Sequence, residues 1–168
     1  PYIKQADVLQ GFYFFEDHFS KEQLEKNFDF YVPFTVHESS LSASIHAVLA
    51  AAMGRVEQSY EFYLRTSRLD LNDYNAEVNE GLHITSMAGT WLSVVEGFGG
   101  MRIKNDAVCF SPQLPKAWTS FSFKINFRGA ILELFASKSE SRVTLIEGEP
   151  CAVFLDGKRV SLTPKAAL

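Results

Sequence analysis

Cysteine is scarce in this sequence. Only two of the 168 residues are cysteines, Cys109 and Cys151, and they lie too far apart to form a Cys-x-x-Cys pair. Neither a zinc site nor a disulfide framework is therefore indicated, and His37 and His46 lack the i, i+4 spacing of a helical metal pair. We expect no bound metal and a reducing, cytoplasmic location.

Long apolar runs and basic clusters are missing as well. No segment is apolar over the roughly 18–20 residues that a membrane helix needs, and no signal peptide opens the chain, so we expect no membrane contact. Lys and Arg form no stripe, which argues against nucleic-acid binding. The net charge of −4 conceals a reversal, because residues 1–97 carry 6 Lys and Arg against 14 Asp and Glu, whereas residues 98–168 carry 10 against 6. This reversal indicates two structural units.

Hydrophobic periodicity predicts helices over residues 1–100. The 46% hydrophobic content suffices for a packed core. Apolar residues recur at helical spacing from Val8 onwards, and Ser20 with Gln23 forms the capping-box signature of a second helix, which Pro33 ends. Further helices are expected over three segments, of which the first is apolar nearly all round and should be buried: 41–53, 56–69 and 84–95.

Alternating apolar residues predict strands in the rest of the chain. The clearest case is the segment 120–127, which reads SFSFKINF. Asp156-Gly157 is a strong hairpin turn. Further short strands are expected in four segments: 130–136, 142–146, 152–155 and 159–162. The fold class is therefore mainly α with a small β part, and we place the boundary between residues 110 and 111.

Neither part looks complete on its own. The predicted helices carry more apolar surface than they could cover, and a few strands usually pack on something else. The chain also opens on Pro-Tyr-Ile-Lys without an initiator methionine. We expect it to be a portion of a larger protein.

Two polar motifs precede predicted helices in the first part of the chain. Lys4 and Gln5 offer a point charge and an amide, which suit sugar hydroxyls or an anion, or simply form a solvated helix start. Ser39 and Ser40 follow Glu38 at another helix start, where hydroxyls could hold an anion or cap exposed backbone N–H groups.

A third polar motif lies at the start of the helix predicted over 84–95. His83 would stand beside unpaired N–H groups and the positive end of the helix dipole, which attract anions. Gly89 and Thr90 follow further along the helix. The alternative is a helix packed through its apolar side chains, with His83 forming only a structural hydrogen bond.

Stacked helix pairs would bring these motifs together, because the loops at one end of the stack surround one concave site. Lysine, serines and histidine at three helix starts are suited to phosphate recognition. No Walker-type glycine loop is present, so a nucleoside triphosphate is not expected. The acidic run from Asp70 to Glu80, which includes Asp73 and Glu77, is either a solvated loop or a source of the general base of a hydrolase.

Long motifs in this sequence resemble the family-65 glycoside hydrolases, and among them the maltose phosphorylases. Residues 4–9 read KQADVL, residues 34–42 read FTVHESSLS, residues 62–91 read FYLRTSRLDLNDYNAEVNEGLHITSMAGTW, and residues 91–102 read WLSVVEGFGGMR. The resemblance is strongest over residues 1–115. It implies an (α/α)6 barrel followed by a small C-terminal antiparallel β domain. Residues 1–110 would hold the last barrel helices and residues 111–168 the β domain.

The resemblance also implies an activity. Such enzymes invert: inorganic phosphate attacks an α-linked glucose disaccharide such as maltose and yields β-glucose 1-phosphate and glucose, while a carboxylic acid protonates the leaving oxygen. The family's general acid, a glutamate, lies upstream of these motifs, and neither Glu38, Glu77 nor Glu80 occupies its place. The segment is therefore expected to hold no catalytic residue and to need the N-terminal remainder of the enzyme. A homodimer without a cofactor is implied.

Site residues follow from the same matches. The substrate-binding positions fall on Lys4 and Gln5. The phosphate-binding positions fall on five residues: Ser39, Ser40, His83, Gly89 and Thr90.

Three alternatives remain open. Kojibiose and trehalose phosphorylases share much of the pattern. A trehalase-type hydrolase of the same fold would use a carboxylate-activated water instead of phosphate. The third is a non-catalytic carbohydrate-associated module, for which an exposed aromatic such as Trp118 would be the signature.

Overall fold

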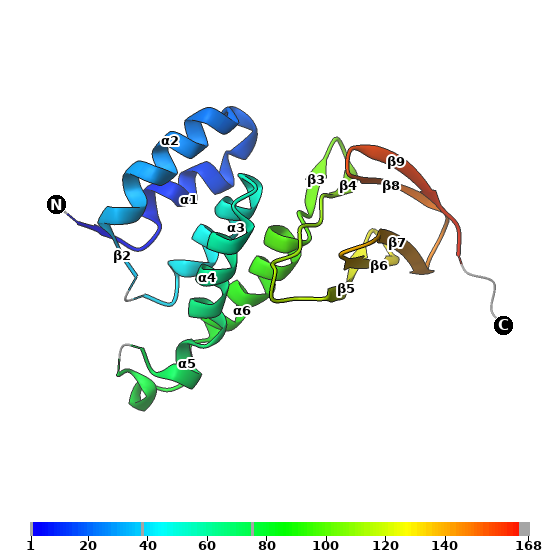
Figure 1. Ribbon diagram of the computed structural model, residues 1–168. Helices are drawn as coiled ribbons and strands as arrows, with labels where there is room; N and C mark the ends of the chain where they lie inside the picture. The colour runs from blue at the N-terminus through cyan, green and yellow to red at the C-terminus, as the bar shows by residue number, and fades with distance from the viewer. Residues whose placement is uncertain (1, 38, 75, 165–168) are drawn as a thin grey trace. The chain divides into compact units, whose positions relative to one another are not determined.

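The chain forms a helical unit and a β unit. The computed structural model describes residues 2–37, 39–74 and 76–164. Helices dominate the first unit, residues 1–97, and strands the second, residues 98–168 (Figure 1). The predicted fold class, helices followed by an antiparallel β domain, is confirmed.

The division between the two units falls where the net charge reverses, before the boundary that we placed between residues 110 and 111. We expected it near residue 110, but the structure divides the chain between Gly97 and Phe98. Two strands account for the difference. β3 (Arg102–Lys104) pairs with β4 (Ala107–Phe110), and β4 pairs with a strand near the end of the chain, so both belong to the second unit.

The first unit opens with two helices joined by short 3-10 turns. α1 spans Asp7–Phe14, and η1 (Glu16–His18) leads to α2, Lys21–Tyr31. Ser20 and Gln23 form the predicted capping box, with each side chain bonded to the other's backbone N–H. Because Pro33 cannot continue the helix, α2 passes into η2 (Val32–Phe34).

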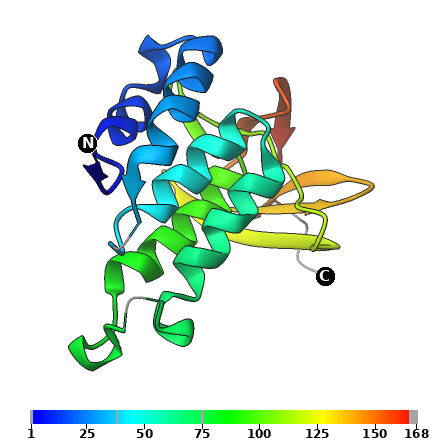
Figure 2. The ribbon, with the colours of Figure 1, turned by 60° about the vertical axis from the view of Figure 1, so that its left-hand side comes forward.

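Three further helices pack together beside this pair. They are α3 (Ala43–Ala52), α4 (Val56–Ser67) and α6 (Ile84–Leu92), which run side by side in Figure 2. Nine of the ten residues of α3 are buried, as its all-round apolar sequence predicts. In the described parts of the chain, no helix is long and apolar enough to cross a membrane.

Buried serines tie these helices to one another. Ser59 on α4 donates its hydroxyl to the Ala47 carbonyl of α3 at 2.7 Å, and Ser86 on α6 donates to the Thr66 carbonyl of α4 at 2.7 Å. Each hydroxyl thus has an acceptor where water cannot reach it, which removes the cost of burying it unpaired.

The segment expected as a polar loop between α4 and α6 contains short helical turns. α5 spans Leu69–Asn72, and η3 spans Val78–Glu80. The chain after α6 continues as a π-helical stretch, η4 (Ser93–Phe98). Two-residue strands β1 (Ile3–Lys4) and β2 (Thr35–Val36) pair in parallel and were not predicted.

The second unit contains two sheets. One has the order β3-β4-β8-β9 and the other the order β5-β6-β7. All pairs are antiparallel except β4 with β8, which is parallel. The strands beyond β4 agree with the predicted ones to within a residue at either end: β5 (Ser120–Phe127), β6 (Ala130–Ser137), β7 (Ser141–Glu147), β8 (Cys151–Leu155) and β9 (Lys158–Leu162).

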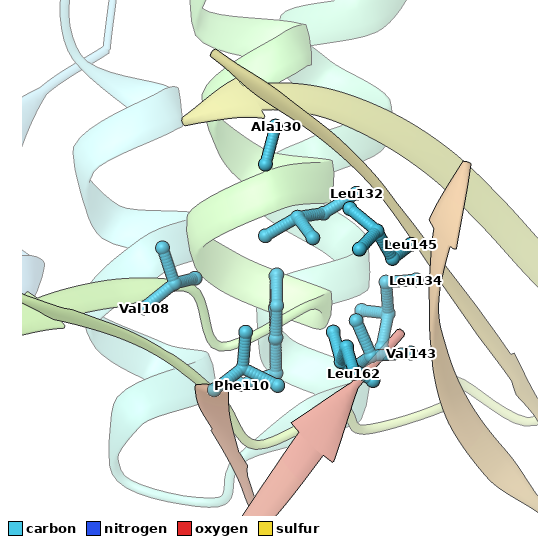
Figure 3. Close-up of a cluster of buried hydrophobic side chains, with 9 residues drawn as sticks. Val108, Phe110, Ala130, Leu132, Leu134, Val143, Leu145 and Leu162 are labelled. Atoms are coloured by element: carbon cyan, nitrogen blue, oxygen red, sulfur yellow. The ribbon is translucent and has the colours of Figure 1, made fainter. Parts of the chain in front are cut away.

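Both sheets contribute to one hydrophobic cluster, whose side chains point toward one another in Figure 3. Strict alternation of buried and half-buried residues along β6 provides its centre, with Leu132 and Leu134 fully enclosed. The predicted hairpin turn at Asp156-Gly157 is confirmed, since both residues have positive φ, 49° and 74°, as a type I′ turn requires.

Candidate functional site

The β1–β2 bridge places Lys4 and Gln5 beside the segment that follows β2. Lys4 lies opposite Val36 in the parallel pair, and the Gln5 N–H donates to the Val36 carbonyl at 3.3 Å. Gln5 has a left-handed φ of 64°, which costs free energy for a non-glycine residue and turns the chain into α1. Two residues far from Ser39 in the sequence thereby come close to it.

The turn that carries Ser39 is held from both sides. Arg65 on α4 donates to the His37 carbonyl at 2.8 Å, and the His37 ring pairs through Nδ1 with the Ser42 hydroxyl at 2.7 Å. Within the turn, the Leu41 N–H donates to Ser39 Oγ at 3.2 Å. Glu38, named in the sequence analysis, lies outside the described residues.

Two neutral histidines, His37 and His46, form hydrogen bonds with Ser42, which follows this turn. Burial lowers the pKa of His37 to about 4, with smaller electrostatic contributions from His46 and Arg65. His46 is fully buried, and burial lowers its pKa too. Its Nδ1 lies 2.8 Å from the Ser42 carbonyl, which can only accept, so the proton is on Nδ1. Both rings are uncharged near neutral pH and act as packing and hydrogen-bonding groups.

His83 occupies the N-cap position of α6 and is held by a carboxylate. Asp70 on α5 contacts it twice, with Oδ1 2.6 Å from the ring Nδ1 and Oδ2 accepting from the His83 N–H at 3.1 Å. On the other side of the ring, Glu77 Oε2 lies 3.6 Å from Nε2. The hydrogen bond to Asp70 raises the pKa of His83, aided by the charges of Asp70, Glu77 and Glu80, and lowers the pKa of Asp70. His83 therefore favours the charged imidazolium form, in contrast to His37.

These segments surround one cavity of about 500 Å³. Its lining comes from β1, β2, the turn after β2, the η3 region and the start of α6. The residues that line it are Tyr2, Lys4, Gln5, Val36, Ser39, Ser40, Glu77, Glu80 and His83. The structure thus brings together five of the seven residues singled out in the sequence.

Gly89 and Thr90 are not among the lining residues. A Cβ on Gly89 would lie 2.6 Å from the Ser44 Cβ, so glycine is needed there to let α6 approach α3. The Thr90 hydroxyl donates to the Ser86 carbonyl at 2.8 Å, within α6. Both residues lie about two helical turns beyond His83, so a role in phosphate binding for either stays a prediction.

Sequence reasoning missed other residues of the site. It treated the run that contains Asp70, Glu77 and Glu80 as a loop or a source of a base, without linking it to His83. Asp73 contributes indirectly, since its carboxylate accepts from the Glu77 N–H at 2.8 Å. Nothing in the local pattern points to these contacts, because they depend on how α5 and η3 fold back onto α6. The described residues contain no group of three or more His, Cys, Asp and Glu placed to hold a metal.

The arrangement offers cations, hydroxyls and carboxylates around one space. Lys4 and charged His83 attract an anion, and the Ser39 and Ser40 hydroxyls can donate to it. Carboxylates such as Glu77 can accept hydrogen bonds from sugar hydroxyls. A ligand that combines a phosphate with sugar hydroxyls would match this set.

Family models match both units. The model of the glycosyl hydrolase family 65 central catalytic domain matches residues 1–92, and the model of the family's C-terminal domain matches residues 101–162. The chain belongs to glycosyl hydrolase family 65. Within this family it is similar to phosphorylases that are named after three different disaccharides: maltose, trehalose and kojibiose.

Relatives in family 65 cover most of this chain. It is 51% identical to maltose phosphorylase of Bacillus subtilis over 89% of its length and 41% identical to alpha,alpha-trehalose phosphorylase of Thermoanaerobacter brockii over 95%. It is 32% identical to kojibiose phosphorylase of Halothermothrix orenii over 99%. A solved structure of a candidate kojibiose phosphorylase from the human microbiome superposes with a TM-score of 0.90 at 38% identity over 97% of this chain.

This family-65 chain spans about a fifth of each of these relatives. It covers 20% of the maltose and trehalose phosphorylases and 22% of the kojibiose phosphorylase and of the solved structure.

Proposed function

We propose that this chain is part of an inverting disaccharide phosphorylase that cleaves maltose with inorganic phosphate to β-glucose 1-phosphate and glucose. The observation that carries the proposal is the cavity of the helical unit, where Lys4, Gln5, Ser39, Ser40 and His83 meet. Membership of family 65 and similarity to three kinds of phosphorylase support it.

In this proposal the cavity has a sugar side and a phosphate side. Lys4 and Gln5, at the end of the β1–β2 bridge, bind hydroxyls of the glucose that is transferred. The Ser39 and Ser40 hydroxyls and the His83 imidazolium bind inorganic phosphate through charge-assisted hydrogen bonds. Phosphate then takes the place of the water and base of an inverting hydrolase.

The remaining catalytic parts belong to the rest of the enzyme. A glutamate of the N-terminal remainder acts as general acid on the leaving oxygen, so this segment alone is inactive. A homodimeric assembly, a cytoplasmic location and the absence of a cofactor are further parts of the proposal. They rest on the family resemblance and on the cysteine content, and each can be checked on the complete protein.

We name maltose as the substrate, rather than trehalose or kojibiose, because the sequence identity to the maltose phosphorylase is higher than to the other two phosphorylases. The identity is 51% to a maltose phosphorylase, 41% to a trehalose phosphorylase and 32% to a kojibiose phosphorylase. The test is to measure phosphate-dependent kcat/KM of the full-length enzyme for all three disaccharides. We expect maltose to be the best substrate. A higher value for trehalose or kojibiose would replace maltose by that sugar and leave the phosphorylase class in place.

A hydrolase of the trehalase type is a second candidate because Glu77 and Glu80 line the same cavity. Either carboxylate could serve as base for an attacking water. The hydrolase would release glucose whether or not phosphate is present, whereas the phosphorylase requires phosphate.

A non-catalytic carbohydrate module has less support. Trp118, its candidate platform, is half-buried in the β unit, and its ring packs against Phe98 and Phe121 at centroid distances of 4.8 and 5.8 Å. These contacts indicate a packing role for Trp118.

A further inference from the structure

The contact between Asp70 and His83 is built like a two-point clamp. One carboxylate oxygen lies 2.6 Å from the ring Nδ1, and the other accepts the backbone N–H of the same residue at 3.1 Å. Such a contact fixes the backbone at the start of α6 and the rotation of the ring together. The two side chains are only 20% and 19% exposed, so water has limited access to either.

The clamp determines which ring nitrogen is available to a ligand. A carboxylate can only accept, so Nδ1 must carry a proton, and Nε2 is left on the side of the ring where Glu77 lies at 3.6 Å. Glu77 and His83 both line the cavity. An anion bound in the cavity would therefore meet Nε2–H.

Charges around the ring strengthen this orientation. The charged groups around His83 in the described structure are Asp70 on α5, Glu77 just before η3, Glu80 at the end of η3, and Lys4, which lines the same cavity. Asp70 makes the shortest contact and, of the three carboxylates, is the one that does not line the cavity. It can stay in place while a ligand enters, whereas Glu77 stands where the ligand would bind.

We propose that Asp70 is a positioning residue of the phosphate site, an inference that rests on the proposed function: it keeps His83 protonated and directs its Nε2–H into the cavity as a charged donor. Asp70 touches neither sugar nor phosphate. It acts through the imidazole, as carboxylates do that orient histidines in other enzymes.

The test compares full-length variants with maltose and inorganic phosphate as substrates. Asp70→Asn keeps the size of the side chain and an acceptor for Nδ1–H but removes the charge. Near neutral pH we expect KM for phosphate to rise roughly tenfold, because loss of the Asp70 charge lowers the pKa of His83 and weakens its charge-assisted hydrogen bond to the anion. KM for maltose and kcat at saturating phosphate should change little. The pH at which phosphate use weakens should fall, and Asp70→Glu, which keeps the charge, should restore much of the pH profile.

A matched control removes a carboxylate that has no link to the cavity. Asp29 on α2 is bonded to Arg55, and Asp29→Asn should leave KM for phosphate and the pH profile at wild-type values. A double-mutant cycle adds a second test. In a His83→Gln background, Asp70→Asn should have no further effect on KM for phosphate, because Asp70 acts only through His83. If Asp70→Asn does not fold, the same cycle is run with Asp70→Ser, which also removes the carboxylate.

The possible outcomes separate this inference from the proposed function. Direct titration of the wild type with inorganic phosphate by calorimetry shows whether the site binds phosphate at all. If it binds phosphate and Asp70→Asn matches Asp29→Asn in KM and pH profile, the inference is overturned while the phosphorylase stands. An equal effect of Asp70→Asn with and without His83 also overturns it. A wild type that neither binds nor consumes phosphate overturns both.

Discussion

The imidazole of His83 lies between two carboxylates, with Asp70 on its Nδ1 side and Glu77 on its Nε2 side. A second histidine, His37, packs against the rings of His46 and Phe62 and has no carboxylate contact among the described residues. Two residues of the same type in one small region thus have opposite charge preferences, with the pKa of His83 raised and that of His37 lowered. The difference comes from their neighbours.

The first prediction concerns His83 in the full-length enzyme. His83→Ala should raise KM for phosphate by roughly 10- to 100-fold, the usual loss when a hydrogen bond to a charged group is removed. KM for maltose should change little, because Lys4 and Gln5 remain. Steady-state kinetics with each substrate varied in turn measures both. An unchanged KM for phosphate would remove His83 from the site.

The raised pKa of His83 also gives a direction to the pH dependence of phosphate use. His83 binds its proton more tightly in the folded protein, so the benefit of its charge is fully present below its ordinary pKa of 6.5. That benefit is lost as pH rises through the higher folded-state value. Phosphate affinity should weaken on the alkaline side for this reason.

The second prediction uses the opposite shift at His37. Its folded-state pKa of about 4 lies below its ordinary value of 6.5, so the unfolded chain binds the extra proton as pH falls through this window. Stability is therefore lost on acidification, by about 2 kcal/mol between roughly pH 7 and pH 5. His37→Asn should remove this part of the pH dependence. Parallel stability-against-pH curves for the two proteins, from denaturant unfolding, would contradict it.

At the scale of elements, close packing of α3 and α6 depends on one glycine. A methyl group at Gly89 would meet the side chain of Ser44, which is buried in helix α3. Because α3 is enclosed along nearly its whole length, it cannot move aside cheaply.

The third prediction follows from this contact. Gly89→Ala should destabilise the protein by about 1–3 kcal/mol, the usual cost of overpacking, although alanine is the better helix former. Gly11 on α1 is the matched control, since a Cβ there meets nothing within 4 Å, and Gly11→Ala should be neutral or stabilising. Thermal unfolding of both variants measures the difference. Equal midpoints would show that α6 has room at Gly89.

Elements with strong local signals could be predicted from the sequence. The capping box of Ser20, the alternation over β5 and the Asp156-Gly157 turn each depend on neighbouring residues, and each prediction agrees with the structure. β1 to β4 were missed because they are only two to four residues long, and β1, β2 and β4 have partners in distant segments. Local patterns contain no information on such pairs.

The same contrast holds for the site. The motifs with Lys4, Ser39 and His83 were visible because each precedes a helix, and the structure places them around one cavity. The close approach of Gly89 to Ser44 could not be read from the sequence, because it depends on how α6 packs against α3. Asp70 was not linked to His83, because that contact is made only when α5 folds against the start of α6.

At the scale of the whole molecule, the helical unit leaves one side of α6 uncovered. Ile84, Met87 and Trp91 follow one another at helical spacing and are 67%, 46% and 52% exposed. The chain spans about a fifth of its relatives, and we infer that the rest of the enzyme covers this face.

The fourth prediction tests that inference in the full-length protein. Met87→Glu should lower the unfolding midpoint by several degrees, because it would bury a charge without a partner. Met87→Leu, which keeps the apolar surface, is the control and should unfold near the wild-type temperature. Equal midpoints for the two variants would mean that this face of α6 stays in water.

The β unit has its own hydrophobic cluster, which includes Val108, Leu134 and Leu162. The residues assigned to the proposed sugar and phosphate sites all lie in the helical unit. The proposed chemistry therefore belongs to the helical unit.

The most direct test of the central claim is to incubate the full-length enzyme with maltose, with and without inorganic phosphate, and to follow the products by NMR. We expect glucose and β-glucose 1-phosphate in equal amounts, formed only when phosphate is present. The β configuration would establish inversion in the same spectrum. Release of two glucose molecules per maltose regardless of phosphate would contradict the account and point to Glu77 or Glu80 as the base of a hydrolase.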